Sequence, residues 1–203
     1  MKTMRMNLKS LALVAVLATG MFAVSCDKEN DLFMQDEMSA QDELKKGQSV
    51  PPGTQSIAAI ALADDGEFDE LVAALVHVDT ELNAGLVELF LNGTDQYTVF
   101  APTDAAFEAL YQALGVSAIT EVDAQTVLNV LLYHVTEGRR AANSVVPKNG
   151  TRTIETLLGS TFSVNTSGQI TAVGNSANIV KANISASNGI IHVIDTVILP
   201  ITL

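Results

Sequence analysis

The sequence contains no tryptophan, one cysteine and few aromatic residues, which make up 5% of its 203 residues. One cysteine cannot form an intramolecular disulfide, and the lack of tryptophan argues against a lectin that stacks sugars on indole rings. Basic residues are also few, with 11 Lys and Arg against 23 Asp and Glu and a formal net charge of -12. A chain this acidic repels nucleic acid, so we expect no nucleic-acid partner.

Motifs that carry catalysis or bind cofactors are missing as well. The chain has no Gly-x-Ser-x-Gly segment, phosphate-binding loop or dinucleotide fingerprint. Its histidines, His77, His134 and His192, lack the i, i+4 spacing and the cysteine partners of zinc sites. The sequence therefore predicts a protein that is not an enzyme and that holds no metal and no small-molecule cofactor.

The N-terminus has the layout of a secretory signal. Residues 1–10 carry three positive charges, and residues 11–24 form an apolar run of 14 residues, too short to span a bilayer. The run ends on Ala23-Val24-Ser25-Cys26, which resembles the bacterial lipobox, although Ala23 replaces the usual leucine. We expect a lipoprotein-type signal peptide at residues 1–25, cleaved before Cys26, and palmitate-type acyl chains on Cys26 that anchor the protein to the outer membrane.

Residues 26–55 have the composition of a flexible acidic tether. Periodicity vanishes, Asp and Glu dominate, and Pro51-Pro52-Gly53 closes the segment. Acidic residues just after a lipidated cysteine resemble the surface-export signals of Bacteroidetes lipoproteins, which favours a position on the cell surface. The alternative is a linker that is merely solvating.

Residues 56–203 are expected to form one domain, in which helices come first and strands second. Helical periodicity predicts a helix capped by Ser56, a second with Phe68 and Val76 on its apolar face, and a third that includes Leu82 and ends at Asn92-Gly93. It also predicts one that starts at Thr103 or Asp104, and one capped by Thr120 or Asp123 that ends near Gly138. A period of two then predicts strands at residues 151–156, 161–165, 169–173, 178–182 and 190–199. The segregation indicates an α+β fold in which the β-prone run Tyr97–Ala101 joins the later sheet.

Three segments resemble the signatures of the fasciclin domain, in the right order. They are Thr-Val-Phe-Ala-Pro-Thr-Asp-Ala-Ala-Phe at residues 98–107, Leu-Tyr-His-Val at 132–135, and Asn-Gly-Ile-Ile-His-Val-Ile-Asp at 188–195 with Leu199-Pro200 after it. The resemblance implies a fasciclin-like fold, a β-sandwich or wedge of short strands with a cluster of helices packed against it. Members of that family are mostly extracellular or membrane-tethered, serve in adhesion, and have no generally established catalytic activity.

One position departs from the adhesive animal members. They have an Asp-Ile pair shortly before the last signature, whereas this chain has Asn183-Ile184. The missing carboxylate argues against integrin-like recognition. The Tyr-His pair of the family is retained as Tyr133-His134.

The signature residues allow a binding interpretation and a structural one. In the binding interpretation, Tyr133 and His134 form a patch that contacts a partner. In the structural interpretation, which we favour, His134 forms a hydrogen bond with Thr103 or Asp104 and Tyr133 packs within the domain. His192 lies in an apolar strand and is expected to be a satisfied core residue. Asn188-Gly189 is expected to make a turn in which glycine supplies a positive φ.

Together these observations predict a membrane-anchored, surface-exposed lipoprotein whose fasciclin-like domain binds a protein or glycan in adhesion. The alternative is a periplasm-facing structural or accessory lipoprotein that scaffolds an envelope complex. Within the domain, the basic residues form either a patch or scattered solubilising charge; they are Arg139, Arg140, Lys148, Arg152 and Lys181.

Overall fold

A computed structural model describes residues 51–63 and 66–202. The predicted signal peptide, Cys26 and most of the predicted tether lie outside these residues. Within them, no helix has both the length and the apolar character needed to cross a membrane.

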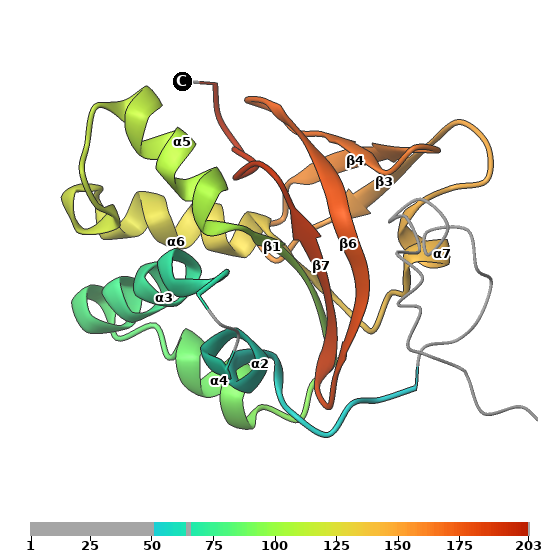
Figure 1. Ribbon diagram of the computed structural model, residues 1–203, viewed down its shortest axis with the longest axis horizontal. Coiled ribbons are helices and arrows are strands. Elements are labelled where there is room, and N and C mark those ends of the chain that lie inside the picture. The colour runs from blue at the N-terminus through green and yellow to red at the C-terminus, as the bar shows by residue number, and fades with distance from the viewer. Residues whose placement is uncertain (1–50, 64–65, 203) are drawn as a thin grey trace, which may run out of the picture. The chain divides into compact units, whose positions relative to one another are not determined.

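The helices gather on one side of the central strands, as Figure 1 shows. This helical layer contains α2 (Ile57–Ala63), α3 (Asp69–Leu82), α4 (Leu86–Asn92), α5 (Asp104–Leu114), the short 3-10 helix η1 (Ile119–Glu121) and α6 (Ala124–Tyr133). The four-residue helix α7 (Ala142–Val145) lies on the other side, near β3 (Thr151–Glu155) and β4 (Thr161–Asn165), as Figure 1 shows.

Local capping chemistry sets the starts of three helices where the sequence predicts them. The side chain of Ser56 accepts a hydrogen bond from the Ala59 amide at 3.3 Å, and Thr103 accepts from the Ala106 amide at 3.3 Å. Asp123 accepts from the Thr126 amide at 3.0 Å. Each of these bonds gives a side-chain acceptor to an amide of the first helical turn, where the i−4 carbonyl of a continuing helix is missing.

Two predicted helix boundaries are wrong. The helix expected to end near Gly138 stops at Tyr133, and Val135–Glu137 forms the strand β2 instead. Val135 and Thr136 are buried and β-branched, so sheet pairing outweighs the helical period there. Leu82, expected in the third helix, is the last residue of α3, because Asn83 adopts a left-handed conformation with φ of 52° and ends that helix.

Seven strands within the described residues form one sheet, in the order β2-β1-β7-β6-β5-β4-β3. The first strand in the chain, β1 (Tyr97–Pro102), joins the later strands as predicted and runs parallel to β7 (Gly189–Ile194), while the other pairs are antiparallel. The remaining strands are β3 (Thr151–Glu155), β4 (Thr161–Asn165), β5 (Gln169–Thr171) and β6 (Ser176–Ala186).

The strand β6 is longer than the predicted 178–182 and pairs with β5 at its start and with β7 along its length. Its register shifts between Ile179 and Ile184, and such irregularities bend a strand. One apolar core lies between the helices and the two neighbouring strands β1 and β7. A second core packs Phe100 against Phe162 at a ring-centroid distance of 5.0 Å, together with Tyr133. The structure is therefore an α+β fold with a bent mixed sheet.

Candidate functional site

Tyr133, the first half of the Tyr-His pair, lies in the core. Its side chain is 0% exposed, its ring meets Phe162 edge-on at 5.9 Å, and its hydroxyl donates to the Thr161 carbonyl at 2.9 Å. Tyr133 thus joins α6 to β4 and is not part of an exposed patch.

His134 is also buried, with 2% of its surface exposed. Its Nδ1 donates to the Val130 carbonyl at 2.6 Å, and its Nε2 accepts from the Ile198 amide at 3.1 Å. Because an amide can only donate, the ring is neutral with its proton on Nδ1. Burial lowers the pKa of His134 to about 4. The predicted bond from His134 to Thr103 or Asp104 is wrong, since both ring nitrogens are bonded to backbone elsewhere.

The corner at Thr103 and Asp104 joins α5 to α3 instead of to α6. The Asp104 carboxylate accepts from the Glu70 amide at 2.9 Å, and the Asp104 amide donates to the Glu67 carbonyl at 3.1 Å. Glu70 lies in the first turn of α3, where free amides and the helix dipole favour a negative charge. The corner therefore fixes the start of two helices at once.

His192 lies in β7 and is 0% exposed. Its Nε2 donates to the Arg140 carbonyl at 2.9 Å, and its Nδ1 accepts from the Asn183 amide at 3.4 Å. Burial lowers the pKa of His192 to about 4. The imidazole thereby holds the chain after β2 against the sheet. The structure places His192 in the core, as a residue whose polar atoms have partners.

Asn188 does more than make a turn. Its side-chain oxygen accepts from the Ile57 amide at 2.8 Å, and its side-chain nitrogen donates to the Phe90 carbonyl at 2.9 Å. The turn residue is only 4% exposed and ties the start of α2 to α4. These partners are 131 and 98 residues away, so no local pattern in the sequence indicates them.

The predicted reason for glycine at position 189 is wrong. Gly189 does not have a positive φ; it is a glycine because a Cβ there would lie 2.1 Å from the Tyr97 carbonyl oxygen. The residue opens β7, directly opposite Tyr97 in the parallel pair. Close approach of two backbones, not turn conformation, selects glycine here.

Asn183, at the position where adhesive animal members have an aspartate, forms a hydrogen bond within the domain. It adopts φ of 64°, and its side-chain oxygen accepts from the Ala142 amide, the first of α7, at 2.8 Å. Its neighbour Ile184 packs against the helix-side core. Asn183 therefore connects the start of α7 to β6 through this hydrogen bond.

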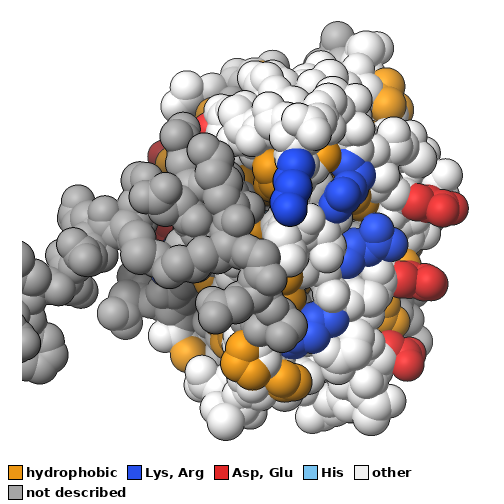
Figure 2. Space-filling view, turned by 90° about the vertical axis from the view of Figure 1, so that its right-hand side faces the viewer, with side chains coloured by type: hydrophobic (Ala, Val, Ile, Leu, Met, Phe, Trp, Pro, Cys, Tyr) orange, Lys and Arg blue, Asp and Glu red, His pale blue; other side chains and the backbone are white. Residues whose placement is uncertain are grey.

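Charge is unevenly divided along the domain. Residues 66–133 contain eleven Asp and Glu and no Lys or Arg, whereas residues 134–202 contain five Lys and Arg and three Asp and Glu. Figure 2 shows Lys and Arg side chains gathered on the face that lies away from the helical layer. This clustering answers the question left open by the sequence, because the basic residues form a patch.

Arg139 differs from the other four basic residues. Its guanidinium donates to the carbonyls of Pro51 at 2.9 Å and Ala186 at 2.8 Å, and also to the Gly189 carbonyl and the Ser185 hydroxyl. Burial lowers its pKa. The guanidinium of Arg139 therefore links the end of β6 and the start of β7 to Pro51, at the entry to the domain.

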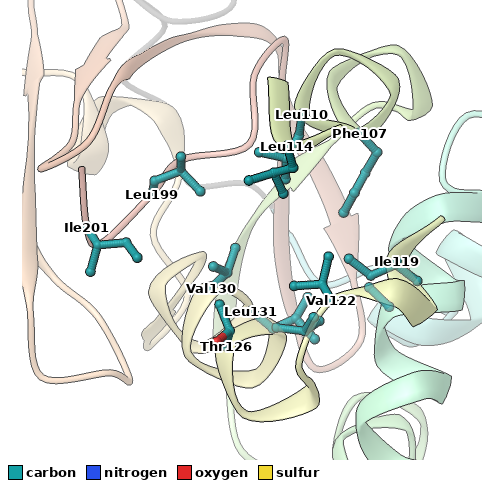
Figure 3. Close-up of a pocket in the computed structure, with 12 residues that line it drawn as sticks. Phe107, Leu110, Leu114, Ile119, Val122, Thr126, Val130, Leu131, Leu199 and Ile201 are labelled. Atoms are coloured by element: carbon teal, nitrogen blue, oxygen red, sulfur yellow. The ribbon is translucent and has the colours of Figure 1, made fainter. Parts of the chain in front are cut away.

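An apolar cavity of about 90 Å³ lies between the helical layer and the segment that follows β7. Figure 3 shows Leu199 and Ile201 facing Leu110, Leu114 and Val130 across it. The cavity thus separates α5 and α6 from the segment that follows β7. Elsewhere in the described residues, no three His, Cys, Asp or Glu side chains converge to hold a metal ion.

Comparison with known proteins assigns this architecture to a family. The family model described as the fasciclin domain matches residues 66–200. The chain belongs to the fasciclin domain family. The match starts just before α3 and ends at Pro200, so this fasciclin domain includes every strand of the sheet and the buried Tyr133, His134 and His192.

Three related proteins illustrate the range of the family. Over 155 residues the chain is 36% identical to the immunogenic protein MPB70 of Mycobacterium bovis, covering 75% of this chain and 73% of that protein. It is 32% identical over 165 residues to the cell surface glycolipoprotein MPB83 of the same species, covering 81% and 69%. It is 34% identical over 139 residues to the transforming growth factor-beta-induced protein ig-h3 of Sus scrofa, covering 68% of this chain and 18% of that protein.

Proposed function

We propose that this protein is an exported lipoprotein, anchored to the outer membrane through Cys26, whose fasciclin domain binds another macromolecule at the cell surface. The observation that carries the proposal is the order of parts in one chain. A fasciclin domain at residues 66–200 follows a basic and apolar leader that ends on Ser25-Cys26. A relative of similar length, MPB83, is named a cell surface glycolipoprotein.

The buried polar groups support a binding module rather than an enzyme. A general base needs a ring nitrogen that can reach a substrate proton. In both His134 and His192 the two ring nitrogens already face backbone groups, and both rings are buried. These histidines serve the fold.

The acidic segment after Cys26 supports a position on the outer leaflet. Seven Asp and Glu residues lie between Asp27 and Glu43, and a lipid-anchored coil of this length holds a domain on the order of 30 Å from the head groups. A domain held at that distance can reach macromolecules outside the cell. A periplasm-facing scaffold remains the competing function that the experiment must separate.

The experiment compares cells that carry Cys26→Ser, Ala23→Leu or the unaltered chain. The unaltered protein should incorporate an alkynyl fatty acid and sediment with membranes, and Ala23→Leu, which restores the usual leucine, should do the same. Cys26→Ser should lose both the label and the adhesion of cells to surfaces coated with envelope or matrix macromolecules. Undiminished label in Cys26→Ser would refute the anchor, and equal adhesion of all three strains would refute the binding function.

A further inference from the structure

Four cations surround the short helix α7 and form what we call the basic face: Arg140, Lys148, Arg152 and Lys181. The hydrogen bonds of Arg152 and the chain positions of the other three place them near this helix. Arg152 donates to the carbonyls of Asn143, at 3.3 Å, and of Ser144. Asn183, two residues after Lys181 on β6, accepts from the first amide of α7. Lys148 follows α7 by three residues, and Arg140 precedes it by two.

The four cations of the basic face keep their charge available to a ligand. Lys148 and Lys181 are exposed, and Arg140 and Arg152 are partly exposed. Within residues 51–63 and 66–202, no carboxylate forms an ion pair with any of them; the hydrogen bonds of Arg140 and Arg152 are to backbone carbonyls. Carbonyl contacts orient a guanidinium without neutralising it. The basic face is therefore a cluster of positive charges on an acidic protein, with Glu137 and Glu155 lining the same pocket as Arg140.

The surroundings of the cations distinguish between classes of anionic ligand. From α7 to the middle of β3, the exposed neutral side chains are all polar: Asn143, Ser144, Asn149, Thr151 and Thr153. Protein partners bury an apolar and aromatic centre, which this segment does not offer. Amides and hydroxyls beside cations match a ligand that carries many hydroxyl groups as well as regular negative charges.

Resting on the binding function proposed above, we propose that the basic face binds an acidic polysaccharide, a polymer of sugars that carry carboxylate or sulfate groups. The cations pair with the acidic groups, and the neighbouring amides and hydroxyls bond the sugar hydroxyls. The eleven acids of residues 66–133, which lie in or beside the helical layer, repel the same polymer. This asymmetry orients the domain, with the basic face toward the polysaccharide.

Binding of polygalacturonate to the full-length protein purified in detergent tests the proposal. The double variant Lys148→Gln/Lys181→Gln should bind about thirtyfold more weakly, since each lysine near a dense anionic surface changes the affinity about fivefold and the two changes multiply. Binding should also weaken as salt rises, because exposed charges are screened within about 8 Å at physiological ionic strength. Lys45→Gln/Lys46→Gln, in the predicted tether, makes the same change in net charge and should bind as the unaltered protein does.

Several results would overturn the proposal. One is that neutral dextran of the same length binds as well as polygalacturonate. A second is that the two double variants lose the same amount of affinity. A third is that poly-glutamate or phosphatidylglycerol vesicles bind more tightly than polygalacturonate at equal charge concentration. Circular dichroism spectra of each variant should match that of the unaltered protein, as the check that the fold is kept. If the polysaccharide fails to bind while Cys26→Ser still abolishes cell adhesion, the inference about the ligand is wrong and the proposed function stands.

Discussion

Replacing Asn188 by alanine should destabilise the domain by about 3 kcal/mol. The substitution removes two hydrogen bonds, each contributing about 1 kcal/mol net, and leaves the Ile57 amide and the Phe90 carbonyl without partners in a buried site, at about 1–3 kcal/mol each. Partial relaxation and solvent access reduce the simple total. The loss should act on the junction of α2, α4 and the start of β7.

Urea unfolding measures this loss directly. With a denaturant dependence of about 2 kcal/mol per M, the midpoint of Asn188→Ala should fall by about 1.5 M. The exposed Asn149 provides a matched control, and Asn149→Ala should change the free energy of unfolding by less than about 0.5 kcal/mol.

Hydrogen exchange adds a local readout for the same variant. The Ile57 amide should exchange faster in Asn188→Ala, because its acceptor is gone. If the two asparagine variants unfold at the same urea concentration and the Ile57 amide stays protected, the assignment of Asn188 as a link between helices is refuted.

Three further perturbations follow from the buried groups. His134 and His192 have pKa values of about 4 in the folded state, against about 6.5 in the unfolded state. The free energy of unfolding should therefore be highest above pH 6.5 and fall by about 3 kcal/mol per histidine as the pH drops to 4. Urea titrations at each pH measure this fall. Gly189→Ala should unfold or strongly destabilise the domain in a thermal melt, whereas Gly138→Ala, which has open space but a φ of +83°, should cost only about 1 kcal/mol. Val130→Ile adds a methylene toward the apolar cavity and should raise the free energy of unfolding by about 0.5–1 kcal/mol in the same urea assay.

Each of the three has an outcome that contradicts it. A stability profile that is flat between pH 6.5 and 4.5 would mean that the histidines are not held neutral by burial. Equal melting temperatures of the two glycine variants would remove the close approach to Tyr97 as the reason for Gly189. A less stable Val130→Ile would show that the cavity has no room for a methylene.

Features that depend on neighbours in the chain could be predicted from the sequence. Thr103 and Asp123 cap helices because side-chain oxygens three residues before a free amide reach it. Gly115 ends α5 in a left-handed conformation with φ of 72°, which glycine adopts without strain. The run from β1 into α5 is fixed by such local rules, and so is the α+β division.

Features that depend on distant partners could not be predicted. The helical period continues through Val135, yet that residue pairs with Val99 in the sheet. His134 bonds the amide of Ile198, 64 residues away, and not the nearer corner at Thr103. A pattern of residue types carries no information on such pairings, because burial and hydrogen-bond satisfaction are decided only when the elements pack.

The proteolysis of intact cells is the measurement that most directly tests the central claim, a fasciclin domain held outside the cell by a tether from Cys26. Protease added to intact cells should cut the segment between Cys26 and Pro51 and release the folded domain into the medium, while a periplasmic marker stays intact. A domain that remains with the cells after the same treatment, and is cut only after lysis, would contradict the claim and place the protein on the periplasmic side.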